Sequence, residues 1–129
     1  MTACLPLLPQ SLSTAIADRL RRRILQGEWQ PGASMLDGEI ASSLGVSRTP
    51  VREAMKLLCH EGLLTAHPRR GMTVAIVSAA HVQEAQALLQ LLHSHLAQHP
   101  AIEGGLAQQM QALAMQRLQL ASLTALTQN

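Results

Sequence analysis

Two arginines, Arg48 and Arg52, lie four residues apart in the segment SRTPVREAMKLL, and Lys56 follows at the same interval. On a helix this spacing puts the three basic side chains on one face. A guanidinium can donate two hydrogen bonds to guanine O6 and N7 or grip a phosphate, and an α-helix fits the major groove of B-DNA. The pattern therefore predicts a helix that enters DNA with a basic face.

The other residues of this segment predict how the helix is held. At about 100° per residue, Thr49 and Glu53 fall beside the basic side chains, whereas the opposite side collects Val51, Ala54, Met55, Leu57 and Leu58. Pro50 is the third residue after the expected N-cap Ser47, where its missing N–H has no intrahelical acceptor to lose. Any surface helix has a charged face opposite an apolar one, so this pattern alone does not decide for DNA.

The position of the helix favours DNA. Residues 12–26 form an expected helix that ends before Gly27, and after Pro31 and Gly32 a second, short helix, capped by Asp37, ends at Gly45. The buried positions predicted for these two helices are Ile16, Leu20, Ile24, Ile40, Ala41 and Leu44. The basic helix then runs from Ser47 to about His60, before Gly62, and completes a helix-turn-helix whose second helix reaches base edges.

A β-hairpin is expected directly after this helix. LLTA and MTVAI alternate apolar and small polar residues around HPRRG. A polar hairpin tip is usually just solvated, but next to a helix-turn-helix it indicates a wing that contacts DNA. The predicted DNA-binding residues are Ser47, Arg48, Thr49, Arg52, Lys56, His67, Arg69, Arg70 and Gly71. For Arg21, Arg22 and Arg23, a phosphate contact and a solvated helix end remain equal alternatives.

Charge divides the 129 residues into two expected domains, 10–77 and 78–129. Nine of the ten Lys and Arg lie in residues 1–77, whereas the second part holds only Arg117 against Glu84 and Glu103. The first part is therefore predicted to be a basic DNA-binding domain, and the second a nearly uncharged helical segment.

The second part carries two apolar stripes at helical spacing, separated by HPAIEGG. Two helices with broad apolar faces favour a helical hairpin that pairs with a second copy as a four-helix arrangement. The predicted dimerisation residues are Val82, Leu89, Leu92, Leu96, Leu106, Met110 and Leu113. Two alternatives stay open: the stripes pack on the DNA-binding domain of the same chain, or they remain from a domain that a truncation has removed.

Composition excludes several other classes of protein. The chain has two cysteines, no CxxC pair and no apolar run long enough to span a membrane, which favours a cytoplasmic protein without a disulfide scaffold. No GxSxG, P-loop or GxGxxG motif frames a catalytic group, so an enzyme is not expected. His95 and His99 lie on one helix face, but two ligands do not complete a metal site. No metal or cofactor is expected.

The segments ILQGEWQPG, EIASSLGVSRTPVREAMKLLCHEGLL and PRRGMTV together resemble the DNA-binding domain of the GntR family of bacterial transcription regulators, most closely its FadR/VanR-type members. The resemblance covers residues 12–77. It implies a homodimer on a short palindromic operator, with Arg48, Thr49 and Arg52 as recognition-helix contacts. It also implies that the turn between His67 and Gly71 approaches the minor groove.

Two features depart from the family pattern. Many members carry a basic, base-reading side chain early in the second helix, where this sequence has Gly38. The helical effector domain of FadR/VanR-type members is much longer, and its RxxLE pattern falls here on Leu89, Leu92 and His93. By length, the second part is similar to the short segment of the YtrA-type branch.

The sequence thus predicts a mainly α protein with a small β-hairpin wing, a winged helix-turn-helix followed by a C-terminal helical hairpin. We expect a sequence-specific transcription regulator, a repressor that binds a palindromic operator in double-stranded DNA as a homodimer; a small-molecule effector is compatible with this. The alternatives are a protein-interaction module whose basic face is incidental, or a truncated regulator without effector response.

Overall fold

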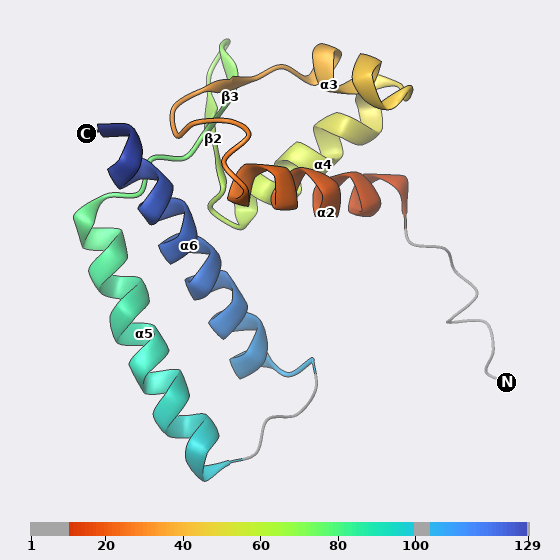
Figure 1. Cartoon of the computed structure of the whole chain (residues 1–129). Helices are drawn as coiled ribbons and strands as arrows, with labels where there is room; N and C mark the ends of the chain where they lie inside the picture. Colours follow the sequence, from red (N-terminus) through yellow and green to blue (C-terminus); the bar gives the residue numbers. More distant parts are fainter. Residues whose placement is uncertain (1–10, 100–103, 129) are drawn as a thin grey trace, which may run out of the picture.

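The computed structural model describes residues 11–99 and 104–128 (Figure 1). Residue 10, at which the predicted first domain begins, lies outside this part, as does Cys4. The helices are α2 (Leu12–Leu25), α3 (Asp37–Leu44), α4 (Arg48–His60), α5 (Ala79–Gln98) and α6 (Leu106–Gln128). The strands are β1 (Ser34–Met35), β2 (Leu64–His67) and β3 (Gly71–Val74). The predicted fold class is therefore confirmed.

The first helix forms where the sequence predicts it. The Ser11 side chain caps α2 by accepting a hydrogen bond from the N–H of Thr14. The expected face of Ile16, Leu20 and Ile24 is buried. Arg22 and Arg23 lie in the last turn, where the helix dipole favours basic side chains.

The corner between α3 and α4 depends on one glycine. Gly45 follows α3 with φ of 69°, a left-handed conformation that a residue without Cβ adopts at little cost. Ser47 is the N-cap of α4, as expected, although its side chain makes no capping hydrogen bond. Asp37 is the first residue of α3 rather than its cap, and Leu36 occupies the cap position. The corner brings the beginning of α4 next to α3.

The wing contains one strand more than the hairpin predicted from sequence. β2 and β3 are antiparallel, with Leu64 opposite Val74 and His67 opposite Gly71. β1 pairs with the other edge of β3, so the strand order is β1-β3-β2. A strand of two residues is too short to show an alternating pattern, which is why the sequence did not reveal it.

One hydrophobic core joins the three N-terminal helices to the sheet. It includes Leu20 and Ile24 of α2 and Val51 and Leu58 of α4. Leu120 of α6 belongs to the same core and is completely buried. Leu57, predicted on the packing face of α4, is instead 42% exposed, because it lies at the margin of the apolar arc.

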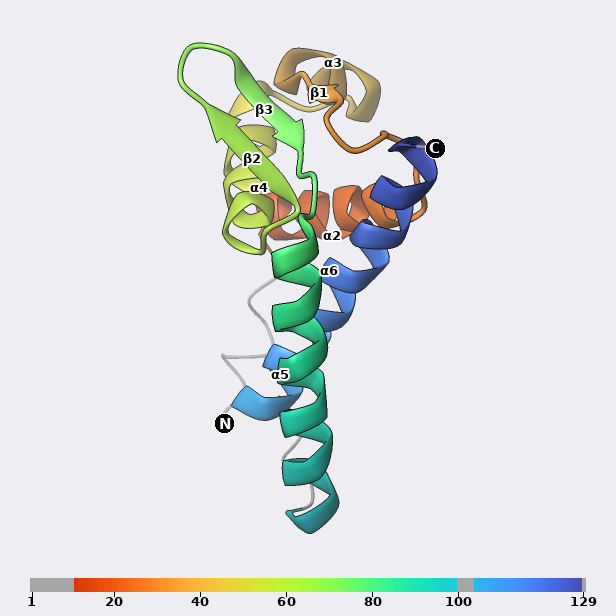
Figure 2. The same cartoon turned by 90° about the vertical axis from the view of Figure 1, so that its left-hand side faces the viewer.

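α5 and α6 form an antiparallel hairpin that extends away from the sheet (Figures 1 and 2). The two helices pack on each other, and the C-terminal half of α6 returns to contact α2. Val82 at the start of α5 and Ala121 and Leu123 near the end of α6 pack against the core. In the part of the chain that the structure describes, no helix is long and apolar enough to cross a membrane.

Candidate nucleic-acid interface

The basic face of α4 is exposed to solvent. Arg48, Thr49, Arg52 and Lys56 all lie on the outer side of the helix, and the exposed residue Ser47 precedes them. The opposite side is fixed by Val51, Ala54, Met55 and Leu58, all buried in the core. The apolar side of the helix is thus fixed in the core, while its basic side chains face solvent.

Arg52 is oriented by a residue of the preceding helix. Its Nε donates a hydrogen bond to Oδ2 of Asp37, and Oδ1 of the same carboxylate accepts from the N–H of Gly38. The hydrogen bond from Arg52 lowers the pKa of Asp37 below its ordinary value, against a smaller opposing effect of burial. Because only Nε is bound to Asp37, the two terminal nitrogens of Arg52 remain available to an acceptor.

Arg48 lies over Gly38. A Cβ built on Gly38 would be 3.0 Å from Nη2 and 3.2 Å from Cζ of Arg48. The missing side chain at this position therefore leaves the space in which the guanidinium of Arg48 rests. Asp37 and Gly38 together set the positions of both arginines of α4.

A groove connects the recognition helix with the wing. It has a volume of about 280 Å³, and Arg52 and Lys56 of α4 line it together with Gly71 and Met72 of β3. Asp37 also lines this groove, and on its other side borders an open hollow formed by α3 and Arg48. Two predicted contacts of the helix, Arg52 and Lys56, and one of the wing, Gly71, thus line the same groove.

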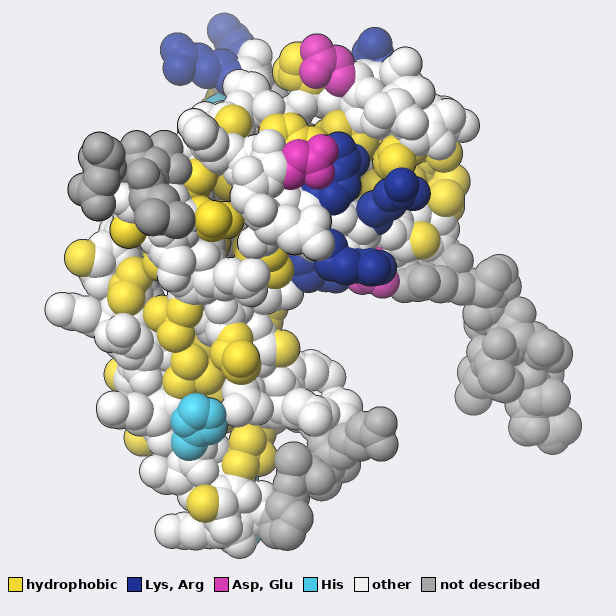
Figure 3. Space-filling model, in the orientation of Figure 1, with side chains coloured by type: hydrophobic (Ala, Val, Ile, Leu, Met, Phe, Trp, Pro, Cys, Tyr) yellow, Lys and Arg dark blue, Asp and Glu magenta, His cyan; other side chains and the backbone are white. Residues whose placement is uncertain are grey.

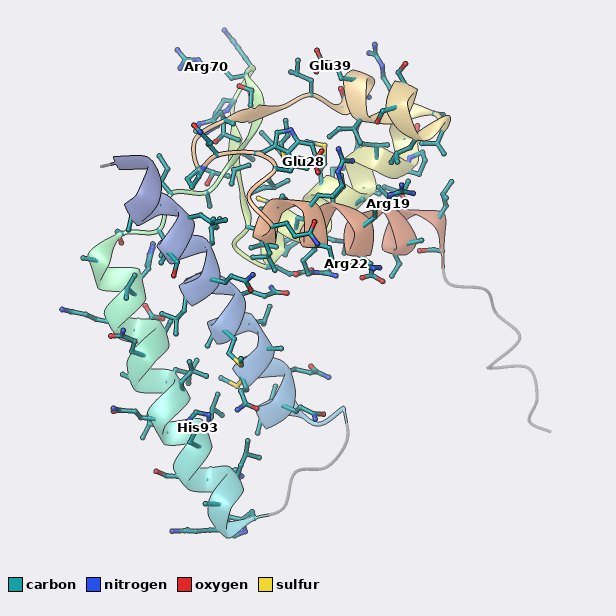
Figure 4. All side chains as sticks on the ribbon, viewed as in Figure 1. Arg19, Arg22, Glu28, Glu39, Arg70 and His93 are labelled. Carbon is teal, nitrogen blue, oxygen red and sulfur yellow. The ribbon has the colours of Figure 1, made fainter. Side chains whose placement is uncertain are left out.

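The tip of the wing is basic and exposed. Figure 4 shows Arg70 at the tip of the wing, pointing away from the core. Arg69 has φ of 65°, a left-handed conformation that is uncommon for a residue with a side chain and closes the turn. His67 is half-buried, and its Nε2 lies 2.8 Å from Oγ1 of Thr73, so its ring is held on the sheet rather than at the tip.

Two of the four arginines in α2 have internal partners. Arg21 donates to both oxygens of Glu61, at 2.7 and 2.6 Å, and to Asp18 at 2.6 Å. Arg23 pairs with Glu28, and its guanidinium lies 4.6 Å from the centre of the Trp29 ring. Of Arg21, Arg22 and Arg23, only Arg22 is exposed, and Figure 4 shows it on the side of α2 that faces away from the wing. In Figure 3, the Lys and Arg side chains in view lie over the DNA-binding domain and none lies on the visible face of the hairpin.

The structure therefore adds Asp37 to the residues that sequence analysis singled out. Its partner Arg52 is fifteen residues away, a separation that no helical or strand spacing connects. The only local signal was an acidic side chain at the start of a helix, which a capping role explains equally well.

The predicted dimerisation residues differ in how much surface they offer. Leu92 is buried within the hairpin, and Val82 packs on the core of the same chain. Leu106 and Leu113 are exposed. The half-buried residues of the set are Leu89, Leu96 and Met110. The alternative that the stripes pack on their own chain thus holds for part of each stripe.

The histidines form no larger cluster. The rings of His95 and His99 are 4.9 Å apart at the end of α5, while His93 points elsewhere on the hairpin (Figure 4). Within residues 11–99 and 104–128, no three His, Cys, Asp or Glu side chains gather as a metal site.

Helices α2, α3 and α4 with the small sheet define a winged helix-turn-helix protein. Residues 12–74 match the family model of the bacterial regulatory proteins, gntR family. Residues 12–74 are thus a helix-turn-helix segment of the gntR type.

Relatives of known sequence match the same region. An uncharacterized HTH-type transcriptional regulator of Streptomyces ambofaciens is 47% identical over 70 residues, which are 54% of this chain and 30% of that protein. The HTH-type transcriptional repressor RspR of Escherichia coli is 33% identical over 92 residues, 71% of this chain and 40% of RspR. The chain thus spans well under half the length of these curated relatives.

Solved structures share the fold over a longer stretch. A GntR transcriptional regulator from Rhodococcus sp. RHA1 superposes with a TM-score of 0.56 and 24% identity, covering 90% of this chain and 66% of that one. Lar of Listeria monocytogenes superposes with a TM-score of 0.52 and 20% identity, covering 91% and 66%. Both similarities show the winged helix with following helices as a shared fold.

Proposed function

We propose that this protein is a sequence-specific, DNA-binding transcription regulator. The observation that carries the proposal is the groove that Arg52 and Lys56 of α4 line together with Gly71 and Met72 of the wing. An α-helix with an exposed basic face can enter the major groove, while a basic hairpin tip beside it reaches the adjacent backbone or minor groove. A regulator of this kind works on chromosomal DNA, so we also propose a cytoplasmic location.

Each basic residue has a role in this proposal. Arg52, oriented through Nε by Asp37, presents its terminal nitrogens to a guanine, which provides sequence discrimination. Arg48, Thr49 and Lys56 contact neighbouring bases and phosphates, and Arg69 and Arg70 bind the backbone beside the site. Ser47 and Gly71 are small, exposed residues that allow a phosphate to approach closely.

We further propose a repressor that binds a palindromic operator as a homodimer. The sequence similarity between this chain and the transcriptional repressor RspR supports a role as a repressor. The α5–α6 hairpin supports a homodimer, because it leaves large apolar side chains in solvent: Leu91 is 70% exposed, Leu106 72% and Met115 56%. A second copy that covers these side chains would form a four-helix arrangement and give the two-fold symmetry of a palindrome.

Selection of bound fragments from random DNA, followed by binding measurements over a range of salt concentrations, tests DNA recognition. We expect a palindrome to be enriched and its affinity to fall steeply with salt, because phosphate contacts release counterions. Arg52→Ala should cost about 1–3 kcal/mol on this site and relax the preference at one base pair. Arg22→Ala, which removes a basic side chain outside the surface, is the matched control.

Two results would contradict this proposal. If no sequence is enriched and binding is insensitive to salt, the fold docks another molecule through a surface whose charge is incidental. If Arg52→Ala weakens binding equally on all sequences, Arg52 contacts a phosphate rather than a base.

Sedimentation tests the dimer separately. Leu91→Asp combined with Leu106→Asp places charges on two exposed positions, so each chain should still fold while the interface carries unpaired buried charges. We expect a monomer with unchanged helical signal. Leu12→Asp, an exposed leucine on α2, is the control that should remain a dimer. A dimer in the double variant would refute the hairpin as the interface.

A further inference from the structure

A glycine occupies the second position of α3, inside the helix rather than at its end. Its backbone is not in the left-handed conformation that favours a glycine at Gly45 and Gly71. A glycine inside a helix is also less stable than an alanine, because it loses more conformational freedom on folding. The absence of a side chain at Gly38 therefore needs a reason other than helix geometry.

The guanidinium of Arg48 occupies the space that a side chain at Gly38 would fill. A Cβ built on Gly38 would lie 3.0 Å from Nη2, 3.2 Å from Cζ and 3.3 Å from Nε of Arg48. If an N–H edge of the guanidinium pointed at this position, Cζ would be farther away than both nitrogens. The guanidinium therefore rests on Gly38 with its flat face, and an added Cβ would push it away.

This orientation keeps the hydrogen-bond donors of Arg48 available. The five N–H groups of a guanidinium lie in its plane, so a group that is docked by its face still directs them outwards. Arg48 is exposed, and with Ser42 and Ser43 of α3 it lines an open hollow of about 580 Å³. An acceptor that enters this hollow can therefore reach an N–H edge of Arg48.

The charge of Asp37 favours the same placement of Arg48. The hydrogen bond from Arg52 is the main cause of the lowered pKa of Asp37, and the positive charge of Arg48 lowers this pKa further. Arg52 thus binds the carboxylate directly, whereas Arg48 is attracted by its charge. Packing on Gly38 and this attraction together hold Arg48 over α3.

We propose that Gly38 is a specificity-determining residue of the DNA interface, because its missing side chain lets Arg48 dock on α3 and present an N–H edge to one base pair. This inference rests on the proposed DNA binding and deepens it. A guanidinium that is already placed loses less conformational freedom on binding, and paired donation to guanine needs a fixed plane. An arginine without this support would bind phosphates as readily, and phosphates carry no sequence information.

Binding of Gly38→Ala to the selected palindrome, its single-base-pair variants and random DNA tests this role. We expect discrimination at one base pair to fall by about tenfold, at the same base pair where Arg48→Ala loses it. Affinity for random DNA should stay within about twofold at constant salt, because no charge changes. Ser42→Ala, which alters a side chain of the same hollow, is the control and should keep full discrimination.

A double-mutant cycle shows whether Gly38 acts through Arg48. In an Arg48→Ala background, Gly38→Ala should cause no further loss of discrimination. An equal loss in both backgrounds would contradict the proposal, since the added methyl group would then meet the DNA itself. Full discrimination in Gly38→Ala, or an equal loss of affinity on all sequences, would contradict it as well.

NMR of the free protein measures the docking without DNA. We expect a nuclear Overhauser effect between Hε of Arg48 and the α-protons of Gly38, and a shift of the Hε resonance in Gly38→Ala. The Hε resonance of Arg70 at the wing tip should stay in place. Absence of both signals would refute the docking, whatever the DNA measurements give.

The combined results distinguish a failure of this inference from a failure of the proposed function. If Arg48 is docked but selection enriches no sequence for the unchanged protein, DNA recognition fails and the role of Gly38 fails with it. If an operator is enriched but Gly38→Ala discriminates as the unchanged protein does, only the role of Gly38 is refuted.

Discussion

The winged helix and the α5–α6 hairpin differ in how completely they bury their apolar residues. In the winged helix, the apolar faces of α2 and α4 are buried against each other and the sheet within one chain. In the hairpin, α5 and α6 bury Ala85, Leu92 and Ala114 between them but leave other leucines in solvent. The same helical periodicity thus marks a face that is covered within one chain in the winged helix and only partly covered in the hairpin.

Charge follows the same division. The winged helix carries nine of the ten basic side chains, some fixed in internal ion pairs and others exposed on α4 and the wing. The hairpin carries only Arg117. This difference is consistent with the proposed division of labour, in which the winged helix contacts DNA and the hairpin contacts a second copy of the chain.

The largest expected difference between the two regions is in how much a leucine contributes to the free energy of unfolding. Leu58→Ala removes a completely buried side chain from α4 and should lower the free energy of unfolding by about 2–5 kcal/mol. Leu106→Ala removes an exposed one and should change it by less than about 0.5 kcal/mol in the monomer. Urea denaturation at low protein concentration measures both. Equal losses would show that the hairpin leucine is buried in the folded monomer.

A smaller effect is expected where the two regions touch. Arg21 and Glu61 are mostly buried and, with Gln116, connect α2, α4 and α6. Arg21→Ala leaves Glu61 without its main partner and should cost about 1–2 kcal/mol of unfolding free energy, because the residual exposure moderates the loss. Arg22→Ala, its exposed neighbour, serves as the control and should cost less than about 0.5 kcal/mol. Similar losses for both arginines would mean that the network is solvated in solution.

These interactions show how much the sequence could predict. The helices, the wing and the exposed arginines of α4 follow from periodicity, capping residues and glycines, which act over a few residues. The pairs Arg21–Glu61 and Arg52–Asp37 join residues forty and fifteen positions apart, and β1 is recognisable only by its partner β3. Such contacts depend on how the elements pack, which local patterns do not contain.

The hairpin shows the same limit. Its stripes predicted two helices correctly, but periodicity does not distinguish a leucine that faces α2 from one that faces solvent. Leu120 and Leu106 lie fourteen residues apart on the same stripe, yet one is fully buried and the other exposed. The difference in exposure follows from where α6 packs: its C-terminal half contacts the DNA-binding domain, whereas its first turns extend beyond that domain (Figure 1).

Gly38 allows a sharper test of the DNA-reading region. Gly38→Ala should raise the free energy of unfolding by up to about 1 kcal/mol, since the guanidinium of Arg48 can move away from the new Cβ. Gly38→Arg should give a similar gain and also tighten operator binding by adding a basic side chain near the groove. Binding titrations of both variants separate stability from recognition. If the arginine adds stability without affinity, this position faces away from DNA.

The smallest expected effect is the titration of Asp37. Its pKa is lowered by Arg52, so the pair stabilises the fold above the pKa of the unfolded state and this contribution is lost as pH falls through the folded value. NMR titration should give a midpoint below the ordinary value of about 3.9. Arg52→Ala should move the midpoint upwards, with Lys56→Ala as the control. An unchanged midpoint would show that the pair does not persist in solution.

The central claim is that one region reads DNA while the other pairs two copies, and binding to a palindrome and to its half-site tests it most directly. The intact protein should bind the palindrome at least about 10²-fold more tightly than the half-site, because pairing makes the second contact intramolecular. The Leu91→Asp, Leu106→Asp variant should bind both DNAs alike, with the affinity of the intact protein for the half-site. If the variant keeps the preference for the palindrome, the hairpin does not pair the copies and the division of labour is wrong.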